Sequence, residues 1–222
     1  MKKKITISFV FTLFSLFAFS QKAQFSFATD ASLLHSFKKE QRFWAIGQTI
    51  AGHFNFAPED GLYVWLAYYS TAQFSNYPTA TAKSIITLPQ QVDYMNRVKL
   101  RIKHFSVGWK HYLRGAYNLE ENWSLYGYGG FGILFGNVVN QHSVPIDSAN
   151  YNIPVLQGTD NFKRLTIDLG LGYEKPMGGD IYFYAEARTL LPTTDYPTSH
   201  LLVNRKAPLT ASVNMGFRIL FN

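Results

Sequence analysis

The feature that most constrains the fold of this chain is an alternation of apolar and polar residues over residues 209–221, interrupted at Leu220. The apolar positions are Leu209, Ala211, Val213, Met215, Phe217, Ile219 and Phe221, and the positions between them include Thr210, Ser212, Asn214, Gly216 and Arg218. A period of two places successive side chains on opposite faces of a β-strand. The segment therefore predicts a strand with one apolar face and one polar face.

Seven earlier segments carry the same kind of pattern, so we expect eight strands in all. They lie near residues 25–33, 42–56, 62–76, 97–113, 123–138, 165–174 and 181–188. Segment 62–76 is apolar on both faces, which leaves its phase open. In segment 97–113 the apolar face changes between Ile102 and Phe105. Either a β-bulge lies near Lys103–His104, or the first half of this strand projects beyond a bilayer.

The connections between these segments alternate in length. Those at 57–61, 114–122 and 175–180 are short, and those at 35–41, 77–96, 139–162 and 192–207 are mostly longer. In an up-and-down barrel this alternation gathers all short turns at one end and all long loops at the other. Short periplasmic turns and long extracellular loops are typical of transmembrane β-barrels. The sequence thus predicts an all-β, eight-stranded antiparallel transmembrane barrel, whose lumen is narrow enough for side chains to fill.

The N-terminus has the layout of a secretory signal peptide. Lys2, Lys3 and Lys4 precede an apolar run at 5–19, and Ala18-Phe19-Ser20 offers a small-x-small cleavage site. We expect residues 1–20 to be the signal peptide and 21–222 to be the barrel domain; an uncleaved N-terminal anchor is the alternative. Three of the lysines behind the net charge of +7 lie in this segment. The basic balance is therefore weak evidence for nucleic acid, and we expect no such partner.

Composition favours a membrane over water as the surroundings of the barrel. Charged residues make up 16% of the chain and aromatic residues 17%. The four tryptophans fall toward strand ends and are expected to form two interfacial aromatic girdles: Trp44, Trp65, Trp109 and Trp123. The alternative is a secreted, soluble, lipocalin-like barrel that binds an apolar ligand, because alternation alone does not distinguish inside from outside.

The polar faces of the strands carry charged residues that a closed barrel would hold in its lumen. They are Asp30, Lys110, Asp168, Glu174, Glu186, Arg188 and Arg218. Buried charges are tolerated when they are paired, so we expect an ion-pair network that fills the lumen; a narrow channel is the alternative. The hairpin around 177–179 predicts that Asp168 pairs with Arg188 across two neighbouring strands.

Other motifs carry little chemistry. The absence of cysteine excludes disulfides, thiol catalysis and cysteine-ligated metals. His35, His142 and His200 lie in or near long loops, where a loop-borne metal site is the alternative to scattered surface histidines. We expect no cofactor, no metal site and no catalytic residue.

In this layout the chain resembles the small outer-membrane β-barrel proteins of Gram-negative bacteria. It is similar to the OmpA transmembrane domain and the OmpX group, and to the outer membrane protein β-barrel domain proteins common in Bacteroidetes. The signal peptide, the eight alternating segments and the final strand carry this resemblance. It implies an outer-membrane location, with outer-membrane lipids and the assembly machinery as partners. It also implies that Phe217, Ile219 and Phe221 act as the assembly signal, although Asn222 follows the last aromatic residue.

The resemblance leaves the function broad. We expect a non-enzymatic barrel that is structural or bears interactions, with an unknown extracellular partner bound through loops 77–96, 139–162 and 192–207. One alternative is a lipid-modifying enzyme, because His104-Phe105-Ser106 is similar to the catalytic pair of lipid A deacylases. Such a pair needs a third, acidic group, and Glu120 and Glu121 are predicted at the wrong depth.

Overall fold

The computed structural model describes residues 23–193, 198–201 and 208–221. The predicted signal peptide at 1–20 lies outside the described residues, as do 194–197 and 202–207 of the predicted loop 192–207. Eight long strands form the barrel: β1 (Gln24–Ser36), β2 (Trp44–Asn55), β3 (Asp60–Asn76), β6 (Asn96–Arg114), β7 (Ser124–His142), β9 (Gly158–Gly178), β10 (Ile181–Pro192) and β11 (Thr210–Phe221).

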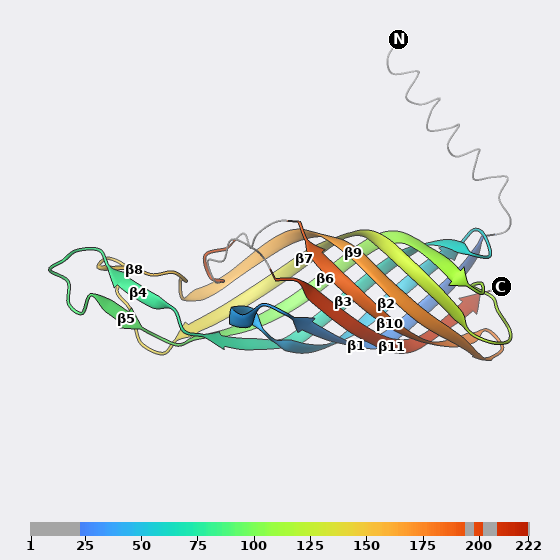
Figure 1. Ribbon diagram of the computed structural model, residues 1–222, viewed down its shortest axis with the longest axis horizontal. Helices are drawn as coiled ribbons and strands as arrows, with labels where there is room; N and C mark the ends of the chain where they lie inside the picture. Colours follow the sequence, from blue (N-terminus) through green and yellow to red (C-terminus); the bar gives the residue numbers. More distant parts are fainter. Residues whose placement is uncertain (1–22, 194–197, 202–207, 222) are drawn as a thin grey trace, which may run out of the picture.

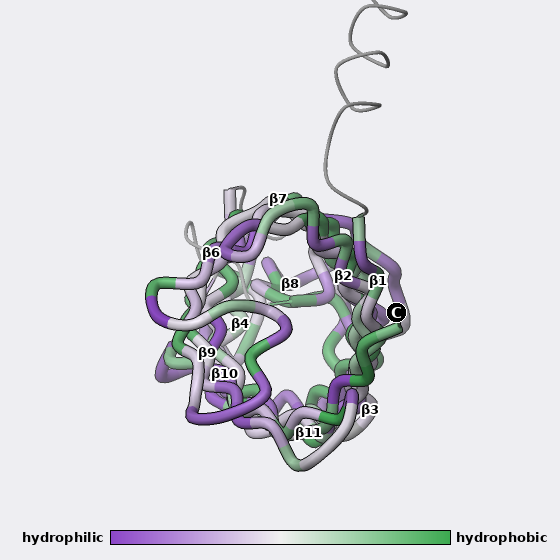
Figure 2. Tube along the Cα trace, turned by 90° about the vertical axis from the view of Figure 1, so that its right-hand side faces the viewer, coloured by the Kyte–Doolittle hydropathy of each residue, from purple (hydrophilic) through white to green (hydrophobic). Residues whose placement is uncertain are grey.

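These strands close on themselves into a barrel (Figures 1 and 2). Their order around it is β1-β11-β10-β9-β7-β6-β3-β2. All neighbours are antiparallel, and β1 meets β11 over twelve residue pairs, from Phe25↔Phe221 to Ser36↔Thr210. Closure leaves the barrel no unpaired sheet edge, which is what a protein needs to cross a bilayer with strands. The predicted eight-stranded antiparallel barrel is confirmed.

The apolar faces of the strands point outward. On β11, Val213, Met215 and Phe217 are exposed, whereas Asn214 and Arg218 between them are buried. The same division holds on β1 and β9, so an apolar belt surrounds the barrel. Soluble monomers rarely expose contiguous apolar surface on this scale. This arrangement opposes the soluble lipocalin-like alternative, which needs the apolar faces inside.

The structure fixes the two strand phases that the sequence left open. In β3, Tyr63, Trp65 and Tyr69 point inward, and the register with β6 shifts between Tyr69 and Ala72. The register of β6 with β7 is unbroken from Asn96 to Tyr112. A bulge near Lys103–His104 is therefore wrong, because the irregularity lies in β3. The inward face of β6 keeps one phase from Val98 to Ser106, and the outward positions of its first half are basic. This agrees with the alternative, in which the first half of the strand projects beyond the bilayer.

The connections follow the predicted alternation with altered bounds. Segments 56–59, 115–123 and 179–180 are short turns at the end where β1 begins and β11 finishes (Figure 1). Segments 37–43, 77–95, 143–157 and 193–209 connect strands at the other end, which we call the loop end. The first of these contains the 3-10 turn η1 (Lys39–Gln41). Both β7 and β9 extend into the predicted loop 139–162, because their ladder continues to Asn140↔Gly158.

A second, smaller sheet lies beyond the loop end of the barrel (Figure 1). Its strands are β4 (Thr79–Ala82), β5 (Gln91–Asp93) and β8 (Tyr151–Asn152), in the order β5-β4-β8. The sequence did not predict it, since two of these strands have three residues or fewer. Among the described residues, no helix is long and apolar enough to cross a membrane.

The outward orientation of the belt can be tested with a charge. Leu169 is outward-facing near the middle of the apolar run on β9. We expect Leu169→Arg to destabilise the folded barrel by about 2–4 kcal/mol, because arginine at the bilayer midplane costs that much on a lipid-facing strand. Leu113→Arg, near the turn end of β6, is the control and should cost about 0–1 kcal/mol. Urea unfolding in lipid vesicles measures both, and equal small effects would contradict a lipid-facing belt.

Candidate functional site

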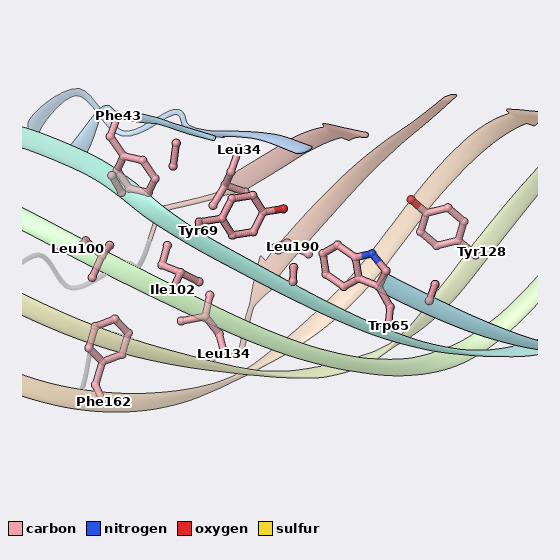
Figure 3. Packing of buried hydrophobic residues seen from close by; sticks show 14 of the residues in the cluster. Leu34, Phe43, Trp65, Tyr69, Leu100, Ile102, Tyr128, Leu134, Phe162 and Leu190 are labelled. Atoms are coloured by element: carbon pink, nitrogen blue, oxygen red, sulfur yellow. The ribbon is translucent and has the colours of Figure 1, made fainter. Parts of the chain in front are cut away.

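The loop half of the lumen is filled by apolar side chains. Leu34, Tyr69 and Leu190 come from three different strands and are fully buried (Figure 3). They belong to a continuous cluster with further inward residues of the loop half: Phe43, Phe74, Val98, Leu100, Ile102, Leu134, Val138, Phe162 and Leu201. Packing of this kind is what an eight-stranded barrel can hold in place of an open pore.

A charged network occupies the turn half of the lumen. Arg218 donates through Nε to Glu174 Oε2 at 3.1 Å, and its Nη2 pairs with Glu174 Oε1. Lys110 Nζ lies 3.4 Å from the same Oε2 and 3.6 Å from the ring centroid of Tyr126. Arg218 also donates to the carbonyl of Tyr117 at 2.6 Å. Glu174 is thus the shared acceptor of two buried cations.

A second network lies around Glu186. Its carboxylate accepts hydrogen bonds from Tyr126 at 2.8 Å and Tyr128 at 3.4 Å, and it lies 3.4 Å from Arg188 Nη2. The guanidinium carbon of Arg188 lies 3.9 Å from the ring centroid of Trp65. Nearby, Tyr184 donates to Asp30 at 2.6 Å.

The predicted pairing of Asp168 with Arg188 is wrong. Arg188 lies opposite Gly170, and Asp168 lies opposite Leu190. The turn places the true register two residues from the predicted one, so the inward faces are right but the partners differ. Asp168 instead accepts a hydrogen bond from Thr166 at 2.8 Å and lies 3.5 Å from His104 Nε2.

The structure places all seven of the charged residues expected in the lumen at buried, inward positions. It adds Arg164, which is 3% exposed on β9 and which the sequence analysis missed. With Arg164, the buried lumen charges of the described residues comprise four cations and four carboxylates. The sequence signal for Arg164 was the alternation along β9. Arg164 lies two residues before Thr166 and four before Asp168, so it shares their inward face.

The tryptophans do not all belong to the girdles. Trp65 is 1% exposed and lies in the lumen, so its assignment to a girdle is wrong (Figure 3). The reason is the phase of β3, where Leu62 and Leu66 take the outward positions. Trp44 is exposed at the loop end of β2, and Trp109 is exposed near the turn end of β6. Trp123 directly precedes β7, with the guanidinium of Arg114 3.8 Å from its ring.

The His104 and Ser106 geometry does not suit lipid chemistry. Both side chains are buried inside the barrel and face away from the lipid. His104 Nε2 lies 2.9 Å from Thr166 Oγ1, while Ser106 Oγ lies 3.3 Å from the hydroxyl of Tyr63. A nucleophilic serine needs its base within hydrogen-bond reach and an open path for substrate. These contacts support a packed lumen.

The loop histidines lie apart. His35 packs between the rings of Phe37 and Trp44, and His142 packs against Tyr94 at 4.5 Å. His200 Nδ1 lies 3.6 Å from Asp160. No three His, Cys, Asp or Glu side chains gather into a metal-binding group within the described part of the chain.

The smaller sheet beyond the loop end presents an apolar tip. Ile85, Ile86 and Leu88 in the β4–β5 hairpin are 91%, 89% and 80% exposed. We call these three residues the apolar tip. They lie in the hairpin farthest from the barrel (Figure 1). Contiguous exposed apolar patches are a mark of interaction surfaces.

The hairpin that carries this tip is held by polar contacts. The side-chain amide of Gln90 donates to the carbonyls of Ile85 at 2.8 Å and Thr87 at 2.7 Å. Lys83 Nζ donates to the carbonyl of Ser148 at 2.6 Å, which joins the hairpin to segment 143–157. Tyr151 donates to the carbonyl of Pro89 at 3.0 Å. The tip is therefore displayed on an ordered support.

The residues expected to form the assembly signal lie together on the outer face of β11. Phe217, Ile219 and Phe221 are each about half exposed, at 51%, 43% and 50%. Phe221 stacks on Phe25 across the strand pair that closes the barrel. Their role in assembly stays a prediction.

Solved structures show where this fold occurs. The chain is similar to Neisserial surface protein A (NspA), with TM-score 0.59 and 10% identity over 90% of this chain and 100% of that chain. A major outer membrane protein from Thermus thermophilus aligns with TM-score 0.52 and 11% identity over the same shares. Ail, the attachment invasion locus protein of Yersinia pestis, aligns with TM-score 0.50 and 10% identity over the same shares, in a complex with a heparin analogue.

No protein-family model matches the sequence, and a search of curated proteins finds no match. The narrower resemblance to the OmpA and OmpX group or to the Bacteroidetes proteins therefore stays a prediction. The fold itself agrees in strand number and closure with the solved barrels. The chain folds as a small eight-stranded barrel of the outer-membrane type, and its continuous apolar belt fits it to the bacterial outer membrane.

Proposed function

We propose that this protein is a non-enzymatic outer-membrane barrel that anchors an interaction surface outside the cell. The observation that carries the proposal is the apolar tip of Ile85, Ile86 and Leu88 on the β5-β4-β8 sheet. Long loops of transmembrane barrels lie on the extracellular side, so we call this sheet the extracellular sheet. The charged, packed lumen supports a structural role for the barrel, because Glu174 pairs with Lys110 and Arg218, and because Ser106 is buried against Tyr63.

The tip has the properties of a binding surface for a macromolecule with an apolar patch. Exposed isoleucine and leucine side chains gain free energy when a partner removes them from water. The contacts of Gln90 and Lys83 hold the hairpin before binding, which lowers the ordering cost of association. Loop 139–162 contributes β8 to the same sheet, so two of the predicted partner loops form one surface.

A crosslinking experiment in intact cells tests the proposal. A photoreactive amino acid at Ile86 should yield discrete adducts with an extracellular partner, and Ile85→Ser/Leu88→Ser should abolish them. The same photoreactive group at Lys39, which is exposed in loop 37–43 at the same end of the barrel, is the matched control. Equal labelling from both positions, or no adduct from Ile86, would contradict the tip as an interaction surface.

A further inference from the structure

A row of basic side chains follows the outer face of β6 at the loop end. Arg97, Lys99, Arg101 and Lys103 occupy four successive outward positions, and all four are exposed. Their inward neighbours are Val98, Leu100 and Ile102, which explains why this half of the strand appeared to change phase. Lys163 joins the row from β9.

The register places Lys103 and Lys163 on either side of Phe135. Lys103 lies opposite Phe135 of β7, and Phe135 lies opposite Lys163 of β9. Strands are separated by about 4.8 Å, so the two lysines stand about 10 Å apart. Lys163 Nζ lies 5.8 Å from the ring centroid of Phe135 between them. One ligand carrying phosphates could contact both cations.

Each of the two lysines lies at the outer edge of the apolar belt, since Lys103 on β6 directly precedes the outward residues Phe105, Val107 and Trp109. On β9 the outward residues from Leu165 to Tyr173 are apolar, and Lys163 directly precedes them. With a rise of about 3.3 Å per residue and a tilt of about 40°, this run spans about 20 Å of bilayer. The apolar band of such barrels is about 25 Å tall. Lys103 and Lys163 therefore lie at the depth of the headgroups of the outer leaflet.

The basic row has no acidic counterpart. None of its five cations forms an ion pair with a carboxylate in the part of the chain that the structure describes. The outward positions around it on β7 and β9 carry neutral polar groups, such as Asn137, which donates to Asn161 at 2.9 Å. Across the barrel, the outward strand positions near this end carry neither lysine nor arginine, and the nearby cations Lys39 and Arg42 lie in loop 37–43. These strand positions are Leu33, His35, Trp44, Ile46, Thr189, Leu191, Ala211 and Val213.

Two grooves on the outer surface meet at this row. The upper groove is lined by Arg101, Lys103 and Lys163 together with the Asn137–Asn161 pair. The lower groove descends over the belt and is lined mainly by apolar side chains, among them Ile50, Leu66 and Phe105. Both grooves include Tyr68, Lys103 and Phe135. A cationic groove continuous with an apolar groove in the bilayer matches the two parts of a phosphorylated lipid.

We infer that this face of the barrel is a binding site for a phosphorylated lipid of the outer leaflet. Lys103, Lys163 and Arg101 bind the headgroup phosphates, and an acyl chain lies in the groove over Leu66 and Phe105. Charge complementarity supports an anionic headgroup, and the depth of the cations at the edge of the belt supports a membrane lipid over a soluble anion. This site is on the barrel wall and is independent of the extracellular sheet.

Native mass spectrometry of the full chain, folded in neutral detergent, tests the inference. The probe is lipid A, a diphosphorylated glucosamine lipid, titrated against the same lipid without phosphates. We expect one retained lipid A molecule and little retention of the dephosphorylated lipid. Lys103→Gln/Lys163→Gln should weaken retention about thirtyfold, because each cation near an anionic headgroup contributes a factor of about five.

The matched control removes two cations at the same end of the barrel but away from the grooves. Lys39→Gln/Arg42→Gln should retain lipid A as the unaltered protein does, and Lys103→Arg/Lys163→Arg should largely preserve retention. Phe105→Ser should weaken lipid A retention through the acyl groove. The faster migration of unboiled samples on gels verifies that each variant is folded, and Ile85→Ser/Leu88→Ser should leave lipid retention unchanged.

Three outcomes would overturn the inference. Equal loss in the two glutamine double variants would mean that net charge alone attracts the lipid. Competition by inorganic phosphate at the concentration of lipid A would mean a site for free phosphate. Tighter binding of a heparin fragment than of lipid A, lost in Lys103→Gln/Lys163→Gln, would assign the row to sulfated polysaccharides.

Discussion

Replacing Glu174 with alanine is expected to destabilise the barrel by about 3–5 kcal/mol, because it leaves two buried cations without a counter-charge. Glu174 is the acceptor shared by Lys110 and Arg218, and all three side chains are buried. Breaking a buried ion pair from one side costs far more than breaking a surface pair. The measurement is urea unfolding in lipid vesicles, followed by the gel shift between folded and unfolded barrel.

Two further variants test whether the loss of stability in Glu174→Ala comes from the unpaired cations or from the loss of any carboxylate. Glu121→Ala removes an exposed acid from the turn 115–123 and should change stability by less than about 0.5 kcal/mol. Lys110→Met/Glu174→Leu/Arg218→Met removes all three charges and should recover much of the lost stability, because apolar replacement of a buried charged group is often neutral or stabilising. A small effect of Glu174→Ala would show that water reaches the two cations.

The second large effect is expected at Trp65. Its side chain fills the lumen, with the guanidinium of Arg188 3.9 Å away and the ring of His104 5.2 Å away. Trp65→Ala should destabilise the barrel by about 3–5 kcal/mol, which is typical of removing a large buried aromatic side chain. The variant leaves an unfilled cavity and also loses the cation–π contact between Trp65 and Arg188.

Trp44→Ala is the matched control, because Trp44 is 59% exposed at the loop end. Its loss should cost well under half as much, since it fills no cavity. Unfolding of the two variants under the same conditions compares a lumen tryptophan with an interfacial one. Equal effects would contradict the inward placement of Trp65 and return it to the girdle.

Sequence patterns were sufficient for face assignment wherever one face of a strand was clearly polar. In β9, β10 and β11 the predicted inward charges, such as Glu174, Arg188 and Arg218, are buried as expected. In β3 both faces are apolar, so the pattern held no information about phase, and Trp65 was misplaced. Only barrel closure, with Leu62 and Leu66 on the outside, decided it.

Partners across strands could not be predicted from faces alone. If the register of a hairpin is predicted two residues away from the true one, every side chain is still assigned to its correct face. Each residue is, however, assigned the wrong partner on the neighbouring strand. The β9–β10 turn has positive φ at Gly178 and Gly179, and a register shift follows between Ile181 and Tyr182. Asp168 lies 3.5 Å from His104, two strands away along the barrel wall, and the registers of β7 with β9 and with β6 set this contact.

The sequence by itself determined the class of fold, the number of strands and the end at which the long loops lie, because these follow from local alternation and spacing. It also determined which strand faces are charged. Tertiary structure alone decided which charges pair, where Trp65 lies, that three short segments form the extracellular sheet, and that Lys103 and Lys163 flank Phe135. Each of these depends on register and closure between residues far apart in the chain, for which local periodicity carries no signal.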